Sequence, residues 1–215
     1  MSITYSNFLT QVRNYTEVDS NVLTDTLIDQ FIRIIELDIA NKIDYDDIRK
    51  YVSAVTGTQK YLNVPDDCLV IRSIQVISSS TRTFLEKKDT SFMAEFNPTD
   101  TTGLPRYYAN WDDKNIVFAP IPDQAYETQL NYIKDPDHFD ALTETFLSKH
   151  QESLLLHGVL TECFSYLKGP SDMYNLYKTK YTEEIQDFAL QQMGRRRRDE
   201  YEDGVPRLKV TSPSP

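Results

Sequence analysis

The histidines are the first residues to consider for catalysis or metal binding, and the chain has three of them: His138, His150 and His157. His150 and His157 lie seven residues apart in a segment with helical character, which separates them by about two turns, or roughly 10 Å. One metal ion cannot bridge that distance directly. We therefore interpret the histidines as residues of the core or its boundary.

Three pairs of aspartates are the second candidates: Asp46-Asp47, Asp66-Asp67 and Asp112-Asp113. Paired carboxylates can transfer protons or bind Mg²⁺, but Asp is also favoured in turns because it hydrogen-bonds the local backbone. The six glycines form no phosphate-binding loop, and no Gly-x-Ser-x-Gly occurs. The sequence thus predicts no catalytic, cofactor-binding or metal site, and no enzyme.

A run of four arginines, Arg195–Arg198, is the most conspicuous motif. It could contact nucleic acid, dock on carboxylates of a partner protein, or be a solvated end of a helix. Acidic residues follow at once and would weaken phosphate binding, so protein docking is the favoured interpretation. The residues expected to form this docking arm are Arg195, Arg196, Arg197, Arg198, Tyr201, Val205, Pro206, Leu208 and Val210.

The charge is unevenly distributed. The chain carries −10 in total, and residues 195–215 hold six basic and four acidic groups, so residues 1–194 carry −12. An acidic body argues against wrapping a nucleic acid, and it suits a surface that DNA passes without binding. The fourteen tyrosines suit either protein interfaces or the core boundary.

Two cysteines, Cys68 and Cys163, lie too far apart in sequence for a disulfide framework or a zinc motif. We expect buried free thiols in a reducing cytosol. The first residues do not resemble a signal peptide, and no apolar run approaches 18 residues, so no contact with a membrane is expected.

Both ends of the chain show helical periodicity. In the segment Thr24–Ile43, apolar residues recur every three or four positions, and Ser20 or Thr24 can cap the start. In the segment Thr143–Lys168, Leu154–Leu160 is apolar on almost every side, and Gly158 is expected to allow a neighbour to approach closely. Tyr5–Tyr15 is a shorter amphipathic helix. The last helix, Ser171–Met193, is expected to carry an aromatic stripe and to end at Gly194.

The middle of the chain has β character. A hairpin is predicted from residues 49–55 and 59–62, and a second from residues 106–109 and 115–119. Further strands are expected at residues 68–77, 83–86 and 129–133, with one helical turn at residues 91–96.

The predicted fold is α+β, mainly α. Residues 1–194 are expected to form a single domain, with a helical bundle from residues 1–47 and 140–194 and a β-hairpin-rich insertion at residues 48–135. Residues 195–215 are expected to form an extended C-terminal arm, because they cannot build a core alone.

Several of these segments resemble the head-to-tail adaptor family of tailed bacteriophages, also called connector or head completion proteins. The segment Leu62–Leu69 resembles the start of the family's β insertion. Pro105–Tyr108 with Ile116–Asp123 resembles its second hairpin and is the most specific piece. The opening helix, the closing helix pair and the long tail complete the resemblance, which covers nearly the whole chain.

The resemblance implies a structural virion protein of the neck, assembled in the host cytoplasm and acting in genome ejection. It implies a ring of subunits beneath the portal, twelve-fold (a dodecamer) like the portal itself. It also implies that the C-terminal arm reaches the portal or a neighbouring subunit, that tail, nozzle or neck proteins bind the other side, and that DNA passes through the lumen.

Other classes remain open on the sequence alone. A tail-terminator-like protein would share this composition. A DNA-binding regulator would need a basic recognition helix, whereas the helices here are acidic or mixed. A hydrolase would need a nucleophile constellation, which the sequence does not offer.

Overall fold

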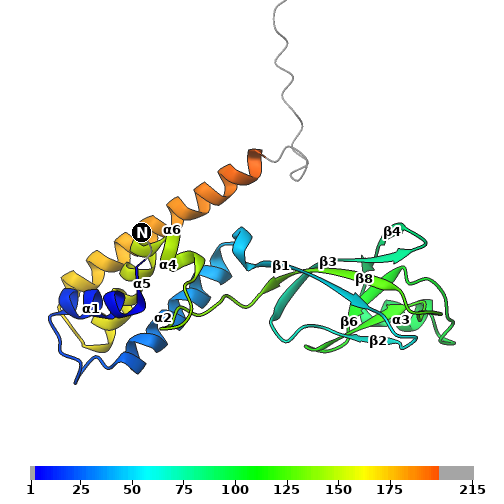
Figure 1. The fold of residues 1–215 in the computed structure, drawn as a ribbon, viewed down its shortest axis with the longest axis horizontal. Coiled ribbons are helices and arrows are strands. Elements are labelled where there is room, and N and C mark those ends of the chain that lie inside the picture. The colour runs from blue at the N-terminus through cyan, green and yellow to red at the C-terminus, as the bar shows by residue number, and fades with distance from the viewer. Residues whose placement is uncertain (1–2, 199–215) are drawn as a thin grey trace, which may run out of the picture. The chain divides into compact units, whose positions relative to one another are not determined.

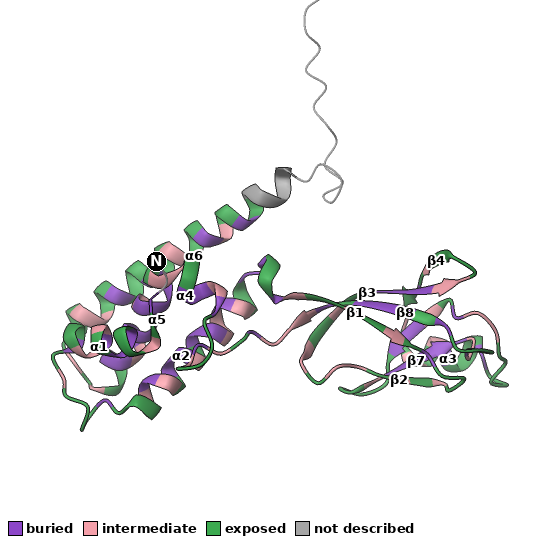
Figure 2. Ribbon diagram, in the orientation of Figure 1, coloured by how far each residue is buried: buried purple, intermediate pink, exposed green. Residues whose placement is uncertain are grey.

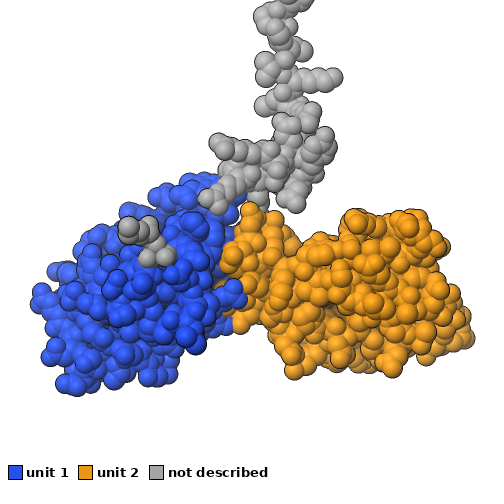
Figure 3. Space-filling model, in the orientation of Figure 1, with its two compact units in different colours: residues 1–45, 137–215 blue, residues 46–136 orange. Residues whose placement is uncertain are grey.

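The computed structural model describes residues 3–198 of the 215, and the side chains as far as Met193. The chain divides into two compact units (Figure 3). Residues 1–45 and 137–215 form a helical unit, so both chain ends contribute to one bundle as predicted. Residues 46–136 form a β unit, which encloses the expected insertion at residues 48–135. The α+β fold class predicted from the sequence is confirmed.

The helical unit contains five helices within the described residues (Figure 1). They are α1 (Tyr5–Thr16), α2 (Asp25–Lys42), α4 (Phe146–His150), α5 (Glu152–Tyr166) and α6 (Ser171–Arg198). The hydroxyl of Thr24 accepts the backbone N–H of Leu27, as expected of the residue that caps α2. Buried and exposed bands alternate along α2 and α6 (Figure 2), as expected of helices with one face against a core.

The single helix predicted from Thr143 to Lys168 is wrong, because the structure has two helices there. The Thr145 and Ser148 side chains form a reciprocal capping box that starts α4. The backbone leaves the helical region at Gln151, which separates α4 from α5. Neither Gly nor Pro stands at this break, so periodicity alone could not place it.

Helix α5 is the centre of the bundle, as its apolar sequence predicted. Its residues Leu154, Leu155, Val159 and Leu160 are fully buried. A Cβ atom at Gly158 would lie only 2.7 Å from a side-chain carbon of Ile35 on α2. The prediction that this glycine allows a close helix approach is therefore confirmed.

Helix α6 carries the predicted aromatic stripe, with Tyr177, Tyr181 and Phe188 buried. The prediction that the helix ends at Gly194 is wrong, because α6 continues to Arg198. One glycine in a helix costs only about 1 kcal/mol relative to alanine, and the arginines that follow are good helix formers. Their positive charge also suits the C-terminal end of a helix.

The β unit has two sheets whose strand pairs are antiparallel except for β5 with β6, one short α-helix, α3 (Thr90–Phe96), and one 3-10 helix, η1 (Asp46–Ile48). The first sheet has the order β1-β8-β3-β4, and the second has the order β2-β7-β6-β5. The strands are β1 (Arg49–Val55), β2 (Tyr61–Asn63), β3 (Cys68–Ser78), β4 (Thr81–Phe84), β5 (Glu86–Lys87), β6 (Tyr107–Asn110), β7 (Asn115–Ala119) and β8 (Glu127–Lys134).

The first predicted hairpin is wrong and the second is confirmed. Strand β1 pairs with β8, at the far end of the insertion, with Val52 opposite Leu130. Strand β2 pairs instead with β7 in the other sheet. The residues between β1 and β2 therefore cross from one sheet to the other, which alternation along the sequence cannot reveal. Strands β6 and β7 do form a hairpin, with Tyr108 opposite Phe118.

The core of the β unit lies between the two sheets. It joins Ile74, Val76 and Leu130 of the first sheet to Ile116 and Phe118 of the second. These side chains point inward from alternate positions of their strands. The opposite face of the first sheet carries exposed apolar and aromatic residues, among them Tyr51, Val55 and Phe84.

Candidate interaction surfaces

The residues that could do chemistry occupy structural positions. No group of three His, Cys, Asp or Glu that could hold a metal ion occurs among the described residues. Burial raises the pKa of Cys68 to about 11 and that of the buried Cys163 to about 12, so both thiols are unreactive near neutral pH. No helix within the described residues is long and apolar enough to cross a membrane.

Two of the acidic pairs shape the backbone of the β unit or bind neighbouring side chains. Asp112 accepts the backbone N–H groups of Lys114 and Asn115 at 2.8 and 2.7 Å, which fixes the turn between β6 and β7. Asp67 accepts the hydroxyl of Tyr132 at 2.8 Å and pairs with Lys50 at 2.8 Å. Asp112 has the local turn role that the sequence indicated, whereas Asp67 binds side chains that are distant in sequence.

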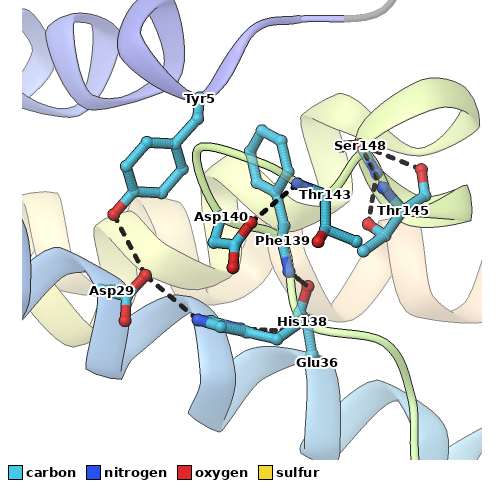
Figure 4. A network of polar contacts seen from close by, with 9 residues as sticks. All are labelled: Tyr5, Asp29, Glu36, His138, Phe139, Asp140, Thr143, Thr145 and Ser148. Atoms are coloured by element: carbon cyan, nitrogen blue, oxygen red, sulfur yellow. Dashed lines mark hydrogen bonds and ion pairs between the residues drawn. The ribbon is translucent and has the colours of Figure 1, made fainter.

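His138 is the centre of a polar cluster in the helical unit, which we call the His138 clasp (Figure 4). Its Nδ1 lies 2.8 Å from Glu36 Oε2, and its Nε2 lies 3.1 Å from Asp29 Oδ1. The Tyr5 hydroxyl donates to the same Asp29 oxygen at 3.0 Å, and the Phe139 N–H donates to Glu36 Oε1 at 2.9 Å. The clasp consists of these five residues and ties α1, α2 and the segment after residue 136 together.

The clasp holds charge in a buried place. Glu36 is 0% exposed, and burial raises its pKa even though His138 and the Phe139 N–H favour the carboxylate. Burial lowers the pKa of His138, but its hydrogen bond to Glu36 and the charges of Glu36 and Asp29 outweigh that effect and raise it. A neutral imidazole has only one N–H, so an imidazolium satisfies both carboxylates best.

The clasp also fixes an exposed loop. Just after it, Asp140 Oδ1 accepts the N–H groups of Leu142 and Thr143 at 2.8 and 2.7 Å. The capping box at Thr145 holds the far end of the loop. Leu142 between these anchors is 96% exposed. A rigidly presented, fully exposed leucine is a candidate contact for a partner protein.

The β unit displays two aromatic surfaces. Tyr61 and Trp111 lie with ring centroids 5.6 Å apart, and Trp111, the only tryptophan of the chain, is 56% exposed. Exposed Trp and Tyr are typical of the residues that dominate protein interfaces. In the sequence, Trp111 falls in the turn of the second predicted hairpin, between residues 106–109 and 115–119, and a tryptophan in a polar turn is the signal that could have marked this surface.

The second aromatic surface lies on α3 and β6. The rings of Phe92, Phe96 and Tyr107 contact one another with centroids 4.9 to 5.7 Å apart. The ammonium group of Lys88 lies 5.5 Å from the Phe92 centroid, within the range of a cation–π interaction. Because Phe96 remains exposed, this cluster is a second candidate contact surface.

The predicted docking arm lies only partly within the described chain. Arg195–Arg198 form the last turn of α6, and their side chains lie outside what the structure describes. Tyr201, Val205, Pro206, Leu208 and Val210 lie outside the described residues altogether. The structure adds two exposed apolar residues just before the arginines, Leu190 and Met193, on α6.

The comparison with known families agrees with the resemblance noted in the sequence. A family model described as SU10 adaptor protein matches residues 3–207. The match spans both compact units and reaches beyond α6 into the predicted arm. A comparison with curated proteins found no match.

Proposed function

The chain belongs to the SU10 adaptor protein family, a family of phage head-to-tail adaptors, and from this premise we propose that it forms a ring beneath the portal. Members of this family are structural components of the head–tail junction that bind other head or tail proteins, and the family is not a known enzyme family. In our proposal the ring joins the portal to the tail and leaves a channel for DNA. The match over residues 3–207 is the observation that carries the proposal.

The surfaces of the chain support an assembling role. Each unit displays exposed apolar or aromatic side chains, such as Leu142 in the helical unit and Trp111 in the β unit. An acidic body of −12 favours passage of DNA over its retention. We expect a gel shift at physiological salt to show only weak DNA binding without sequence preference. Tight, sequence-selective binding would instead favour a DNA-binding regulator.

We further propose that residues 195–215 dock on the portal. Four arginines at the C-terminal end of α6 can each make paired hydrogen bonds to a carboxylate. Ordering the residues that follow costs roughly 1–2 kcal/mol each for the backbone. Several apolar anchors, including Leu208 and Val210, must therefore act together with the arginines. A twelve-fold ring would match the symmetry of the portal.

The test is co-sedimentation with purified portal, followed by negative-stain imaging. Removing residues 199–215 leaves α6 whole, so we expect the melting temperature to stay nearly unchanged while portal binding is lost. Replacing Arg195–Arg198 by alanine should give an intermediate loss that grows with salt. Replacement by lysine is the matched control, because it keeps the charge and removes the paired geometry.

Two results would contradict these proposals. If the chain without residues 199–215 assembles on the portal as well as the intact chain, those residues do not form the docking arm. If the intact chain does not bind the portal but binds the ends of tail tubes, the tail-terminator interpretation is the better one.

A further inference from the structure

The first sheet of the β unit ends in a strand whose outer edge lacks a partner among the described residues. Strand β1 is one of the two edge strands. Thr56, just after it, donates its N–H to Tyr126 O, so Thr56 turns its backbone toward the β8 side. Because direction alternates along a strand, the N–H and C=O groups of Tyr51, Ser53 and Val55 point away from β8. These three residues therefore direct their backbone groups to an edge that pairs with no other strand among the described residues.

The other edge strand, β4, is exposed in the same way. Leu85, next to it, donates its N–H to Ile74 O and so turns toward β3. By the same alternation Arg82 and Phe84 direct their backbone groups away from the sheet. Phe84 is 65% exposed, which is unusual for a phenylalanine unless a partner covers it.

Three features that often protect a sheet edge, namely short length, a proline and a bulge, are missing from β1, although Arg49 and Lys50 begin the strand. The strand is seven residues long, contains no proline, and pairs with β8 without a register shift. A long regular edge invites another strand, and stable monomers normally block it with Pro, a bulge or a covering element. An edge left open on a protein that assembles is a candidate subunit contact.

The strand directions fit one particular partner. Each neighbouring pair in the first sheet is antiparallel, so β1 and β4 run in opposite directions. Copies related by rotation about a ring axis all present their strands in the same sense. The β4 strand of one copy and the β1 strand of the next would then meet antiparallel, as every other pair in the sheet does.

We propose that β4 of one copy pairs with β1 of the next, so that the first sheet continues from subunit to subunit around the ring. This inference rests on the ring of the proposed function and names the contact that closes it. The contact is head-to-tail, with two different edges meeting, which is the arrangement that generates rings. The occupant of each edge is thus a second copy of this chain.

The side chains along the rows of the sheet are compatible with this contact. Ser53, Gln129, Gln75 and Phe84 lie directly opposite one another in one row, so a straight continuation places Phe84 opposite Ser53 of the next copy. A shift by two residues would place it opposite Tyr51 or Val55 and would keep every side chain on its face. All three positions are exposed.

The same junction would bring a second carboxylate within reach of Arg82, at the spacing that separates Arg82 from Glu127 of its own copy across Ile77. Arg82 and Glu127 share the next row of the outer face, and neither forms an ion pair among the side chains that the structure describes, residues 3–193. In the straight register Arg82 lies opposite Val55 of the next copy, and Glu127 of that copy stands one strand further on. An arginine side chain can reach across the valine toward that carboxylate.

Disulfide trapping tests the contact without any other phage protein. Three chains each combine Phe84→Cys with one of Tyr51→Cys, Ser53→Cys and Val55→Cys. Within one copy these positions are three strand spacings apart, about 14 Å, and a disulfide needs Cα atoms within about 7 Å. A disulfide between them must therefore join two copies. Circular dichroism and melting first confirm that each chain folds.

The expected result is a ladder of dimers, trimers and larger species on a non-reducing gel after mild oxidation at high protein concentration. At least one of the three pairs should give it. Phe84→Cys with Lys50→Cys is the matched control, because Lys50 is exposed on the same strand but on the opposite face. Wild-type protein is the control that shows whether the native cysteines, Cys68 and Cys163, form disulfides between copies under the same conditions.

The outcomes separate the contact from its alternatives. Ladder formation by the control pair as well, or by none of the pairs, would overturn the proposal. Dimers from either single variant would show instead that two identical edges pair, which gives a closed dimer and no ring.

A second variant, Ser53→Pro, removes an outward N–H and fixes the backbone angle φ there, while the groups that bond β8 belong to the neighbouring residues; proline is tolerated at such edge positions, so we expect β1 still to pair with β8. We expect individual copies of this variant to fold and to bind the portal, but not to join into a closed ring. Complete rings from this variant would also refute the contact. If a chain with one of the three cysteine pairs forms ladders, but the wild-type chain forms no ring on any portal, the proposed function fails and the edge contact stands.

Discussion

Removing the imidazole from the His138 clasp should destabilise the helical unit strongly. In His138→Ala, Glu36 keeps the Phe139 N–H but loses the cation beside it, and it has no access to water because it is 0% exposed. Breaking a buried ion pair by deleting one partner costs about 3–5 kcal/mol. Since Glu36 can take up a proton instead, we expect the lower end, about 3 kcal/mol. For a chain of this size that lowers the melting temperature by about 6–12 °C.

Glu36→Gln is the matched variant for this measurement. The amide has the shape of the carboxylate, still accepts from the Phe139 N–H, and can donate to His138 Nδ1. No charge is then left buried alone, so the cost should be only about 1 kcal/mol. Urea unfolding followed by circular dichroism measures both variants. Equal costs for the two variants would show that packing, and not charge, holds the clasp together.

The same variants give a pH test with a definite sign. The pKa of His138 is raised in the folded chain above its ordinary value of 6.5, so its contribution is complete below that pH and is lost as pH rises through the folded value. The stability difference between wild type and His138→Ala should therefore be largest near pH 6 and shrink toward pH 9. A difference that is constant over this range, or below about 1 kcal/mol, would refute the account of a charged clasp.

Three further outcomes follow from contacts in the structure. Gly158→Ala should lower the free energy of unfolding by about 1–3 kcal/mol, despite the better helix former, because the new Cβ would lie 2.7 Å from Ile35; an unchanged or higher melting temperature would contradict the close packing. Leu142→Ser should change stability by less than about 0.5 kcal/mol, since the side chain is 96% exposed; thermal unfolding checks this, and a larger loss would mean that the loop packs on the body. Near pH 8 a thiol reagent should modify Cys68 slowly and Cys163 more slowly still, because burial raises their pKa to about 11 and about 12; rapid labelling of Cys163 without denaturant would show that the bundle opens.

The features that the sequence predicted well depend on neighbours along the chain. The start of α2 was predictable because Thr24 and the residues it caps are three positions apart. The hairpin of β6 and β7 was predictable for the same reason. The start of α4 at its capping box could also have been found from Thr145 and Ser148.

The features that the sequence did not predict depend on distant residues. Strand β1 pairs with β8, about eighty residues later, and alternation says only that each is a strand. His138 was correctly placed at the core boundary, but its partners Asp29 and Glu36 are more than 100 residues away. The end of α6 was misplaced because a single glycine was given more weight than the helix formers around it. The candidate contact surfaces were also not predictable from the sequence. Tyr61 and Trp111, for example, come into contact only because β2 and β6 belong to the same sheet.

The proposed edge contact also predicts when the ring can form. Pairing Ser53 and Val55 of one copy with Phe84 and Arg82 of another gives about four backbone hydrogen bonds, each worth about 1 kcal/mol net. Bringing two free chains together costs roughly 4–15 kcal/mol, so the contact cannot hold isolated chains together at micromolar concentration. A portal that holds neighbouring copies side by side raises their effective concentration to the millimolar range and removes much of that cost. Light scattering should therefore find a monomer or weak oligomer in the purified chain, and imaging should find rings only after portal is added. A stable dodecamer at micromolar concentration without portal would show that subunits are joined by a much larger surface than these two short edges.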